Sequence, residues 1–525
     1  MKNLSKKILS VFLSLIIAAT ATVAYVPSSS AADVAGTDIP LIYVTGQGSP
    51  LVINENGTKR EIYPVEVDKD SIIQAAKDNL DVFAKAVITQ EWTEFGNVLR
   101  DIITPIFSEL ALDENGNAPN GSCSTSSYSI SSIKNKKKVD GKYPTRTFTF
   151  NYDWRMDPYK IADQLHQYIE DVMTVTGYDH VALSGRCQGA NIVTAYMDKY
   201  DCEHVSDFIT YCSALNGATV LSKCFAGDIY LDADAVERFC YDLKLSTDEV
   251  INELFQSFVT LFNRTYGLDL ACWAVNNVWD DIYLDILPQV LIETFGTWPG
   301  FWSMVSDEDY VRAKENVFHN QDMDKWANFI EIIDNYHYNV QVKAPEHFRE
   351  YAERGIEMYN IVKYGYQDIP VSAPSDLLSD SYCSVYNASI GATATTLNAV
   401  FDDAYLAAAQ EAGTAKYISP DRQIDASTCL FPDTTWFIKN IPHKTFSDDA
   451  ERLIDAMVNY DHFTVDTNPD FPQYLVFLGE TMVPMAEENM NTTEKYKHSF
   501  WDAISTFFKS LFKVLSNLIK EKIAV

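Results

Sequence analysis

The strongest constraint on the fold is a stretch in which short apolar runs alternate with helical patterns. The apolar runs lie at residues 147–152, 180–184 and 205–211, and the helical patterns lie between them at 158–176 and 188–200. Apolar side chains recur at helical spacing in the longer segments, whereas the short runs are rich in aromatic and β-branched residues. This alternation predicts a mostly parallel β-sheet covered by helices.

The pentapeptide Gly185-Arg186-Cys187-Gln188-Gly189 lies between the second apolar run and the helix that follows it. A strand that turns sharply into a helix needs small residues two positions before and after the turn, and Gly185 and Gly189 supply them. Cys187 then occupies the position of a nucleophile, and Arg186 and the start of the next helix should favour its thiolate. We therefore predict that Cys187 forms an acyl-thioester. A structural cysteine in an inactive scaffold is the alternative.

An acyl-transfer site also needs backbone N–H donors where negative charge develops on the substrate. One donor is expected from Gln188, directly after Cys187. The second is expected in Gly46-Gln47-Gly48, which follows the first apolar run at 39–44. We predict Gln47 as this second donor, with Gly46 and Gly48 shaping the loop. The alternative is that these two glycines only turn the chain.

The general base and its orienting acid are expected after the nucleophile, with the acid before the His. A polar stretch at 421–427 precedes a strand-like run at 434–438, and His443 follows that run. A carboxylate on one loop and a His on the next is the arrangement that a catalytic triad needs. We predict His443 as the general base and Asp421 as the acid, with Asp425 as the alternative acid.

The alternation of strands and helices stops after Gly217. Residues 220–412 are mainly helical, rich in aromatic residues and poor in strand signals, and features typical of the core return after 413. We therefore predict an α/β core in two parts, residues 32–219 and 413–490, with a helical cap inserted between them. A separate helical domain is the alternative.

The two ends of the chain carry apolar segments outside this core. A basic start, an apolar run and small residues up to Ala31-Ala32 predict a secretory signal peptide over residues 1–31. The protein is therefore expected outside the cell, in solution or at the cell surface. Residues 495–525 form an amphipathic basic helix, which predicts either contact with a membrane surface or a terminal helix docked on the core.

The composition limits the partners and cofactors. The chain has 41 basic and 73 acidic residues and a formal net charge of −32, which opposes binding to nucleic acid. Its nine cysteines include no Cys-x-x-Cys pair and match no zinc spacing, so no metal and no cofactor is predicted. An odd number of cysteines in an exported chain also indicates a free thiol.

Four stretches together resemble the lecithin:cholesterol acyltransferase group of lipase-like α/β-hydrolases. They are residues 42–48, 151–155, 185–189 and 209–217, of which the Tyr-Asp-Trp-Arg sequence within 151–155 is the most specific. The resemblance implies an α/β-hydrolase fold, hydrolysis or transfer of acyl groups on lipid or other ester substrates, no metal, and a mobile lid.

The chain departs from that family at three places. Cys187 stands where the family has serine, Arg186 where it has His, and Asp421-Arg422 where it has Asp-Gly. Three hypotheses follow. The first is a secreted hydrolase or acyltransferase that acts on acyl esters through Cys187, His443 and Asp421. The second is an inactive surface protein that binds lipid or glycan, and the third is a cysteine amidase or peptidase.

Overall fold

The computed structural model describes residues 39–65, 74–75, 78–89, 91–124, 147–242, 249–366, 369, 377–490 and 500–523. The predicted signal peptide at 1–31 lies outside these residues. No helix within the described residues is long and apolar enough to cross a membrane.

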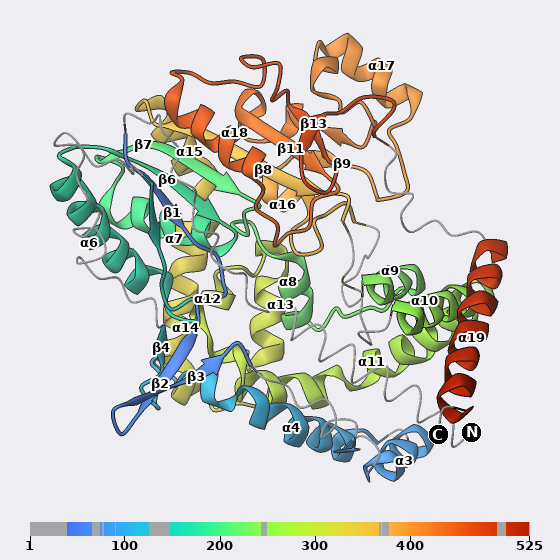
Figure 1. Cartoon of the computed structure of the whole chain (residues 1–525). Coiled ribbons are helices and arrows are strands. Elements are labelled where there is room, and N and C mark those ends of the chain that lie inside the picture. The colour runs from blue at the N-terminus through green and yellow to red at the C-terminus, as the bar shows by residue number, and fades with distance from the viewer. Residues whose placement is uncertain are drawn as a thin grey trace.

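An eight-stranded sheet forms the centre of the fold, with the order β13-β12-β11-β8-β7-β6-β1-β5 (Figure 1). All neighbouring strands are parallel except β12 and β13, so the predicted α/β architecture with a mostly parallel sheet is confirmed. The strands are β1 (Leu41–Val44), β5 (Thr147–Phe150), β6 (Val181–Arg186), β7 (Val205–Tyr211), β8 (Glu357–Tyr364), β11 (Thr435–Lys439), β12 (Tyr474–Phe477) and β13 (Met482–Pro484).

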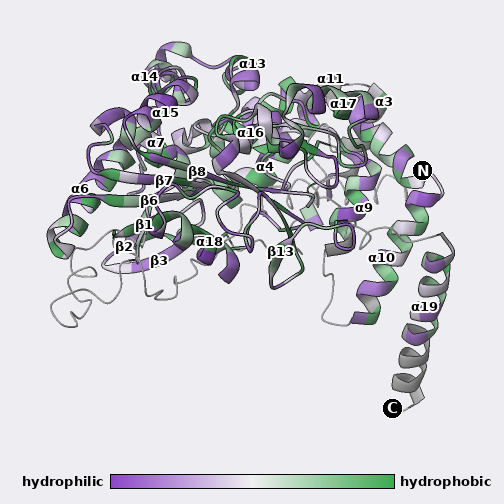
Figure 2. Cartoon of the chain, turned by 90° about the horizontal axis from the view of Figure 1, so that it is seen from above, coloured by the Kyte–Doolittle hydropathy of each residue, from purple (hydrophilic) through white to green (hydrophobic). Residues whose placement is uncertain are grey.

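Helices cover both faces of this sheet. Successive strand residues point to opposite sides, and apolar side chains on both sides must be buried. Ile42 and Val44 of β1 pack into one apolar core with α6 (Pro158–Thr176) and α7 (Gln188–Tyr200). Leu41 packs into a second core on the other face, against α18 (Asp448–Asn459). Figure 2 shows α7 and α18 on opposite sides of the sheet. The strands are therefore buried between two helical layers.

The ends of α6 show how the sequence sets these elements. Asp157 caps its start by accepting a hydrogen bond from the Tyr159 N–H at 2.9 Å, and Pro158 occupies the first helical position. Gly177 ends the helix in a left-handed conformation with φ 81°. The strand β6 follows within a few residues, so α6 returns the chain to the sheet.

Strand β8 corrects the predicted division of the core. Residues 220–412 are predicted from the sequence as a helical cap, but β8 lies within them and pairs with both β7 and β11. The second part of the sheet therefore begins at Glu357 rather than at 413. The helices before β8 are α8 (Thr219–Phe225), α9 (Ala233–Asp242), α10 (Glu249–Arg264), α11 (Gly267–Ile292), α12 (Pro299–Trp302), α13 (Asp307–Val317), α14 (Met323–Tyr336) and α15 (Ala344–Glu353).

The remaining elements lie outside the central sheet. A three-stranded sheet near the start of the chain has the order β3-β2-β4, and a two-stranded sheet pairs β10 with β9. Helix α19 packs against α10 at one end of the molecule (Figures 1 and 2). These elements are β2 (Leu51–Glu55), β3 (Thr58–Tyr63), α3 (Leu80–Thr89), α4 (Thr93–Phe107), β4 (Cys123–Ser124), α16 (Val385–Ser389), β9 (Thr393–Ala394), α17 (Asp403–Ala412), β10 (Ile424–Asp425) and α19 (Phe500–Ile523).

Candidate active site

Cys187 lies in the turn between β6 and α7 and has an unusual backbone conformation. Its φ is 50° and its ψ is −120°, a region that costs free energy for a residue with a side chain. The turn is closed by the Cys187 N–H, which donates to the Tyr211 carbonyl at 3.0 Å. Such strain in a buried turn is typical of a functional position, because the surrounding structure must maintain it.

The glycines on either side of Cys187 are required by close backbone contacts. A Cβ atom at Gly185 would lie 2.6 Å from the Ala190 Cα, and one at Gly189 would lie 2.1 Å from the Val44 carbonyl oxygen. No other residue fits at these positions without moving β1 or α7. The structure thus places both glycines where the sequence predicts a sharp strand-to-helix turn. We call this turn, residues 185–189, the elbow.

The two predicted oxyanion donors lie beside Cys187. The Gln188 N–H is in the first turn of α7, where it has no partner within the helix, and it points at the Cys187 thiol. The loop of Gly46, Gln47 and Gly48 approaches from the other side, since a Cβ at Gly46 would lie 3.1 Å from the Cys187 Cβ. Within the described part of the chain no hydrogen bond from the Gln47 N–H is found, and the Gln47 side-chain Nε2 lies 3.8 Å from the Met304 sulfur.

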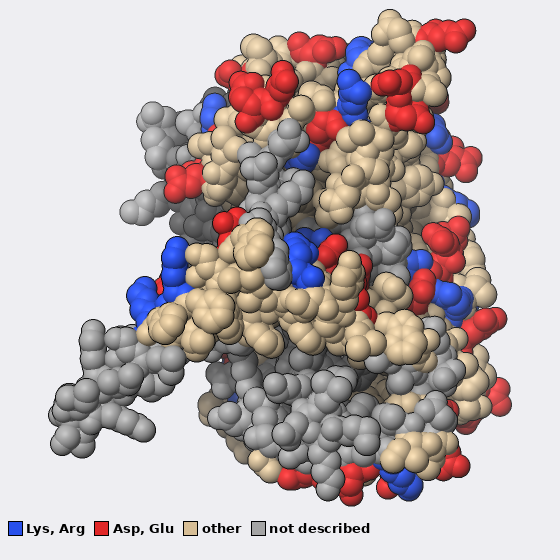
Figure 3. Space-filling view, turned by 90° about the vertical axis from the view of Figure 1, so that its right-hand side faces the viewer, with Lys and Arg blue, Asp and Glu red and all other residues tan. Residues whose placement is uncertain are grey.

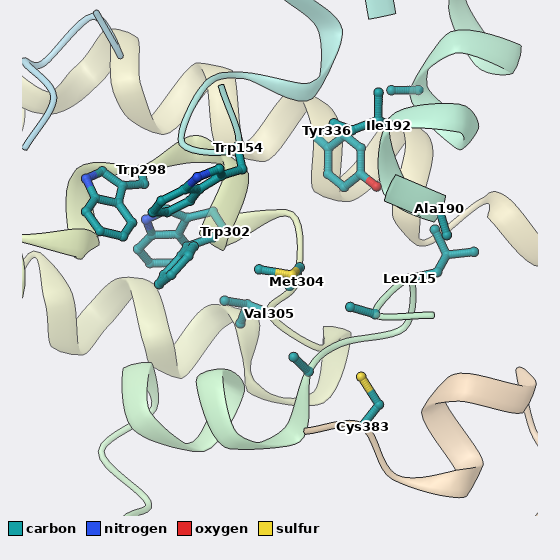
Figure 4. Packing of buried hydrophobic residues seen from close by; sticks show 14 of the residues in the cluster. Trp154, Ala190, Ile192, Leu215, Trp298, Trp302, Met304, Val305, Tyr336 and Cys383 are labelled. Carbon is teal, nitrogen blue, oxygen red and sulfur yellow. The ribbon is translucent and has the colours of Figure 1, made fainter. Parts of the chain in front are cut away.

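The side chain of Gln188 is anchored by the segment Tyr152-Asp153-Trp154-Arg155. Its Nε2 donates to the carbonyl oxygens of Trp154 and Gly300 at 2.8 and 2.7 Å. Trp154 in turn packs edge-on against Trp298 in a buried aromatic cluster (Figure 4). This packing fixes the start of α7, and with it the position of the Gln188 N–H.

Arg155 holds this segment in place. Its guanidinium is fully buried, forms an ion pair with Asp153 at 2.7 Å and donates to the Leu110 carbonyl at 3.0 Å. A buried Arg of this kind needs several acceptors to offset its lost hydration. The segment is therefore structural support for the elbow rather than a part of the reacting site.

His443 lies in the loop after β11 and is paired with a carboxylate that the sequence did not reveal. Its Nδ1 lies 2.6 Å from Oδ2 of Asp380, and both side chains are buried. A carboxylate at Nδ1 fixes the tautomer in which Nε2 is the free base. Burial lowers the pKa of His443, although Asp380 opposes this shift. The ring is therefore neutral near pH 7, as a general base must be.

The predicted acids, Asp421 and Asp425, do not reach His443. Asp421 is buried in an ion pair with Lys439 at 2.7 Å and also accepts from the Tyr364 hydroxyl at 3.1 Å. Asp425 accepts from the Tyr405 hydroxyl at 2.9 Å. The prediction of Asp421 as the acid, and of Asp425 as its alternative, is thus corrected to Asp380. The ion pair with Lys439, at the end of β11, holds Asp421 away from His443.

Asp380 is held in a tight turn. Its Oδ1 accepts the N–H groups of Tyr382 and Cys383 at 3.1 and 2.9 Å, which leaves Oδ2 for His443. Asp380 follows β8 as His443 follows β11, and parallel neighbours end at the same edge of a sheet. If β8 had been recognised in the sequence, an acidic residue in the loop after it would have indicated Asp380.

Two cationic side chains hold the loop that carries His443. The Lys363 ammonium of β8 is buried and donates to the carbonyl oxygens of Pro442, His443 and Thr445. The Arg186 guanidinium donates to the Lys444 carbonyl and lies 5.8 Å from the centre of the Phe446 ring. The loop of His443 is therefore held by side chains from β8 and β6, the two strands on either side of β7. Burial lowers the pKa of Lys363 to about 8.

The Cys187 thiol is protonated in the resting site. Burial raises its pKa to about 12, and the nearby Cys212 adds to this shift. The Gln188 N–H and Arg186 favour the anion as expected, but they offset only part of the burial. The prediction that these groups favour the thiolate is therefore correct in direction, but desolvation of the thiolate costs more free energy than they contribute.

We expect this raised pKa to govern alkylation of Cys187. The rate of reaction with iodoacetamide should still rise about tenfold per pH unit between pH 8 and pH 10, because only the thiolate reacts. A model thiol would approach a plateau above its ordinary pKa of about 8.5. Mass spectrometry of the Cys187 peptide measures this rate, with the exposed Cys123 as internal control. A plateau of the Cys187 rate below pH 9 would contradict the neutral thiol.

Three of these side chains also carry metal-ligand atoms. Among the described residues, Cys212, Asp380 and His443 place one such atom each within 4.8 Å of one another. A sulfur, an imidazole nitrogen and a carboxylate oxygen form a donor set that zinc accepts. A chelator is therefore a necessary control in any assay of this site.

Comparisons with known proteins do not assign the chain to a family. No family model matches the sequence, and no curated protein matches it. Among solved structures the chain is similar to one described as "The crystal structure of Tle4-Tli4 complex", at 12% identity and a TM-score of 0.18. That match covers 35% of this chain and 48% of the other. A likeness at this level says nothing about function.

Proposed function

We propose that this chain is an α/β-hydrolase that cleaves or transfers acyl groups of ester substrates through Cys187, His443 and Asp380. The observation that carries the proposal is the strained elbow at Cys187, whose thiol is influenced by the charge of Asp380, together with the buried pair of His443 Nδ1 and Asp380 Oδ2, 2.6 Å apart. The three residues follow β6, β11 and β8, whose carboxyl ends share one edge of the sheet. The strand order and the acid-before-His order support the same fold.

The first half-reaction forms the thioester. His443 Nε2 takes the thiol proton while the Cys187 sulfur attacks the acyl carbon, and the N–H groups of Gln188 and Gln47 bind the developing oxyanion. The C–O bond to the alcohol then breaks, and the imidazolium returns its proton to the leaving oxygen. Asp380 holds the ring and stabilises the imidazolium during this step.

The second half-reaction releases the acyl group. Water or an alcohol attacks the thioester carbon, and His443 takes the proton of the attacking oxygen. The C–S bond breaks and the thiol is reprotonated, so the site returns to its starting state. Water as the acceptor gives hydrolysis, and an alcohol gives acyl transfer. The product therefore depends on whether water or an alcohol reacts faster with the thioester.

Cys187 variants test this proposal on the chain beginning at Ala32. With chromogenic acyl esters of short and long chain length, Cys187→Ala should lower kcat by about 10⁴-fold or more. Cys123→Ala, at an exposed thiol, should keep the wild-type rate. Cys187→Ser should gain labelling by a fluorophosphonate probe, because a serine then occupies the same elbow.

Other outcomes separate the rival functions. Turnover of an amide panel in preference to esters would indicate an amidase or peptidase. Wild-type turnover in Cys187→Ala that is lost with a chelator would indicate metal chemistry at Cys212, Asp380 and His443. The absence of turnover on esters and amides alike, with an intact fold, would overturn the proposal and favour a binding protein. Export, which rests on residues 1–31, remains a prediction, tested by the location of the full chain in the producing cell.

A further inference from the structure

Exposed large apolar side chains gather on three helices at one end of the molecule. Isolated exposed apolar residues are ordinary, but a cluster of them marks an interaction site. The exposed members are Phe258 and Phe262 of α10, Tyr266 between α10 and α11, Leu270 and Trp273 of α11, and Trp501, Phe508 and Phe512 of α19.

On α10 and α11 these side chains form one row. Phe258 and Phe262 lie four residues apart on the same side of α10, and their rings stack with centroids 5.9 Å apart. The start of α11 rests on the second ring, since a Cβ at Gly267 would lie 2.2 Å from Phe262 Cε2. Leu270 and Trp273, three residues apart, continue the row along α11.

On α19 one side is docked and another is exposed. Ala503 and Ser510 are buried, and the Ser510 hydroxyl donates to Glu253 of α10 at 3.1 Å. Trp501, Phe508 and Phe512 recur at helical spacing and face away from that contact, with Trp501 74% and Phe512 68% exposed. The terminal helix is thus docked on α10 as one sequence hypothesis expects, and it still presents an aromatic stripe.

Basic side chains lie beside that stripe. Lys509 and Lys513 each follow an exposed Phe by one residue and are themselves exposed. Helix α19 contains four lysines and two acidic residues, although the whole chain has a net charge of −32. Figure 3 shows the side of the molecule on which α19 lies, where uncharged side chains form a broad band with basic ones beside it.

We propose that the aromatic stripe of α19, with Lys509 and Lys513 beside it, binds the surface of anionic lipid bilayers. Trp and Tyr rings favour the headgroup level of a bilayer, and Lys beside an apolar stripe pairs with lipid phosphate. Lys is depleted at protein interfaces, so the lysines favour a membrane over a protein partner. The chain would lie on the bilayer through the exposed side of α19, because Phe258 and Phe262 lie on the side of α10 opposite Glu253 and so face away from α19. This inference holds whether or not Cys187 is active.

Co-sedimentation with vesicles tests the proposal on the chain beginning at Ala32. Vesicles of ether-linked phosphatidylglycerol and phosphatidylcholine carry no ester bonds, so lipid cleavage cannot affect the result. Wild-type protein should bind the phosphatidylglycerol vesicles and only weakly the pure phosphatidylcholine ones. The Phe508→Ser/Phe512→Ser variant should lose at least about tenfold in partition coefficient, because two rings no longer insert.

One further variant tests the electrostatic contribution to vesicle binding, and another serves as a control. Lys509→Glu/Lys513→Glu should lose about tenfold or more on phosphatidylglycerol alone, since each lysine near an anionic surface contributes substantially. Tyr460→Ser/Val400→Ser removes exposed apolar side chains elsewhere and should bind like the wild type. Thermal melting of each variant confirms that the fold is intact.

Three results would overturn the proposal. The first is no sedimentation of the wild type with any vesicle at low ionic strength. The second is equal vesicle binding by Phe508→Ser/Phe512→Ser and by the control variant Tyr460→Ser/Val400→Ser. The third is a wild-type protein that binds no vesicle but forms a dimer, seen by light scattering, which Phe508→Ser/Phe512→Ser abolishes. That result would assign the surface to contact with a second copy of the chain. None of these results bears on ester turnover.

Discussion

Replacing Asp380 by Asn is expected to lower kcat by about 10⁴-fold, as loss of the orienting carboxylate does in a serine triad. Asn keeps an oxygen for the Tyr382 and Cys383 N–H groups, so the turn that holds residue 380 should persist. Its amide cannot stabilise an imidazolium at His443. KM should change much less than kcat, because Asp380 is paired with the base.

Asp421→Asn is the matched control for this effect. Asp421 is buried and pairs with Lys439, so the variant leaves an uncompensated ammonium and should destabilise the fold by about 3 kcal/mol. At a temperature where it remains folded, its kcat should stay within about threefold of the wild type. Steady-state kinetics with circular dichroism separates the two effects. The opposite pattern, with Asp421→Asn inactive and Asp380→Asn active, would restore Asp421 as the acid.

Replacing Gly189 by Ala should have the largest effect on stability of any single methyl addition at the site. The new Cβ would lie 2.1 Å from the Val44 carbonyl oxygen and 2.8 Å from that of Thr45, and both belong to backbone that cannot rotate away. Either β1 or the start of α7 must move, which disturbs the elbow as well. We expect a loss of about 3 to 4 kcal/mol in unfolding free energy.

Gly177→Ala provides the comparison. Gly177 has φ 81°, but a Cβ there would meet nothing within 4 Å. It should therefore cost only about 1 kcal/mol, the strain of a left-handed Ala. Urea unfolding of both variants measures the difference. Equal losses would show that the contact with β1 is relieved at little cost, since Gly189 itself has no positive φ.

The elbow could be predicted from sequence because its determinants are local. The small residues around Cys187, the apolar run before it and the helical pattern after it all lie within a short stretch. The same is true of Gln188, which follows directly from the position of the nucleophile. The Gln47 loop was also placed correctly beside Cys187, since the first strand of such a sheet ends next to the elbow strand.

The acid could not be found in this way because its position depends on β8. That strand is buried on both faces and contains Asn360 and Lys363, so it shows neither alternation nor a continuous apolar run. Asn360 is accommodated only because Thr210 on β7 donates to it at 2.7 Å, and Lys363 because loop carbonyls accept from it. These partners are distant in sequence, so the strand was hidden among helices.

The net shift in the thiol pKa could not be predicted from the sequence for a related reason. Arg186 is adjacent to Cys187 in sequence, which favoured a thiolate on local grounds. In the fold its guanidinium contacts Lys444 and Phe446 of the His443 loop. The dominant influence on Cys187 is burial by the whole surrounding structure, and no local pattern reports that quantity.

The buried thiol has a consequence for how long the nucleophile survives. Because burial raises the pKa of Cys187 to about 12, the thiol is almost entirely in its neutral form at pH 7. Peroxides and disulfides react with thiolates, so a cysteine that is almost never ionised is a poor target for them. A site that forms its anion only as it attacks a bound ester is therefore protected from oxidation while it is empty. Such protection would suit a cysteine enzyme that works in oxidising surroundings.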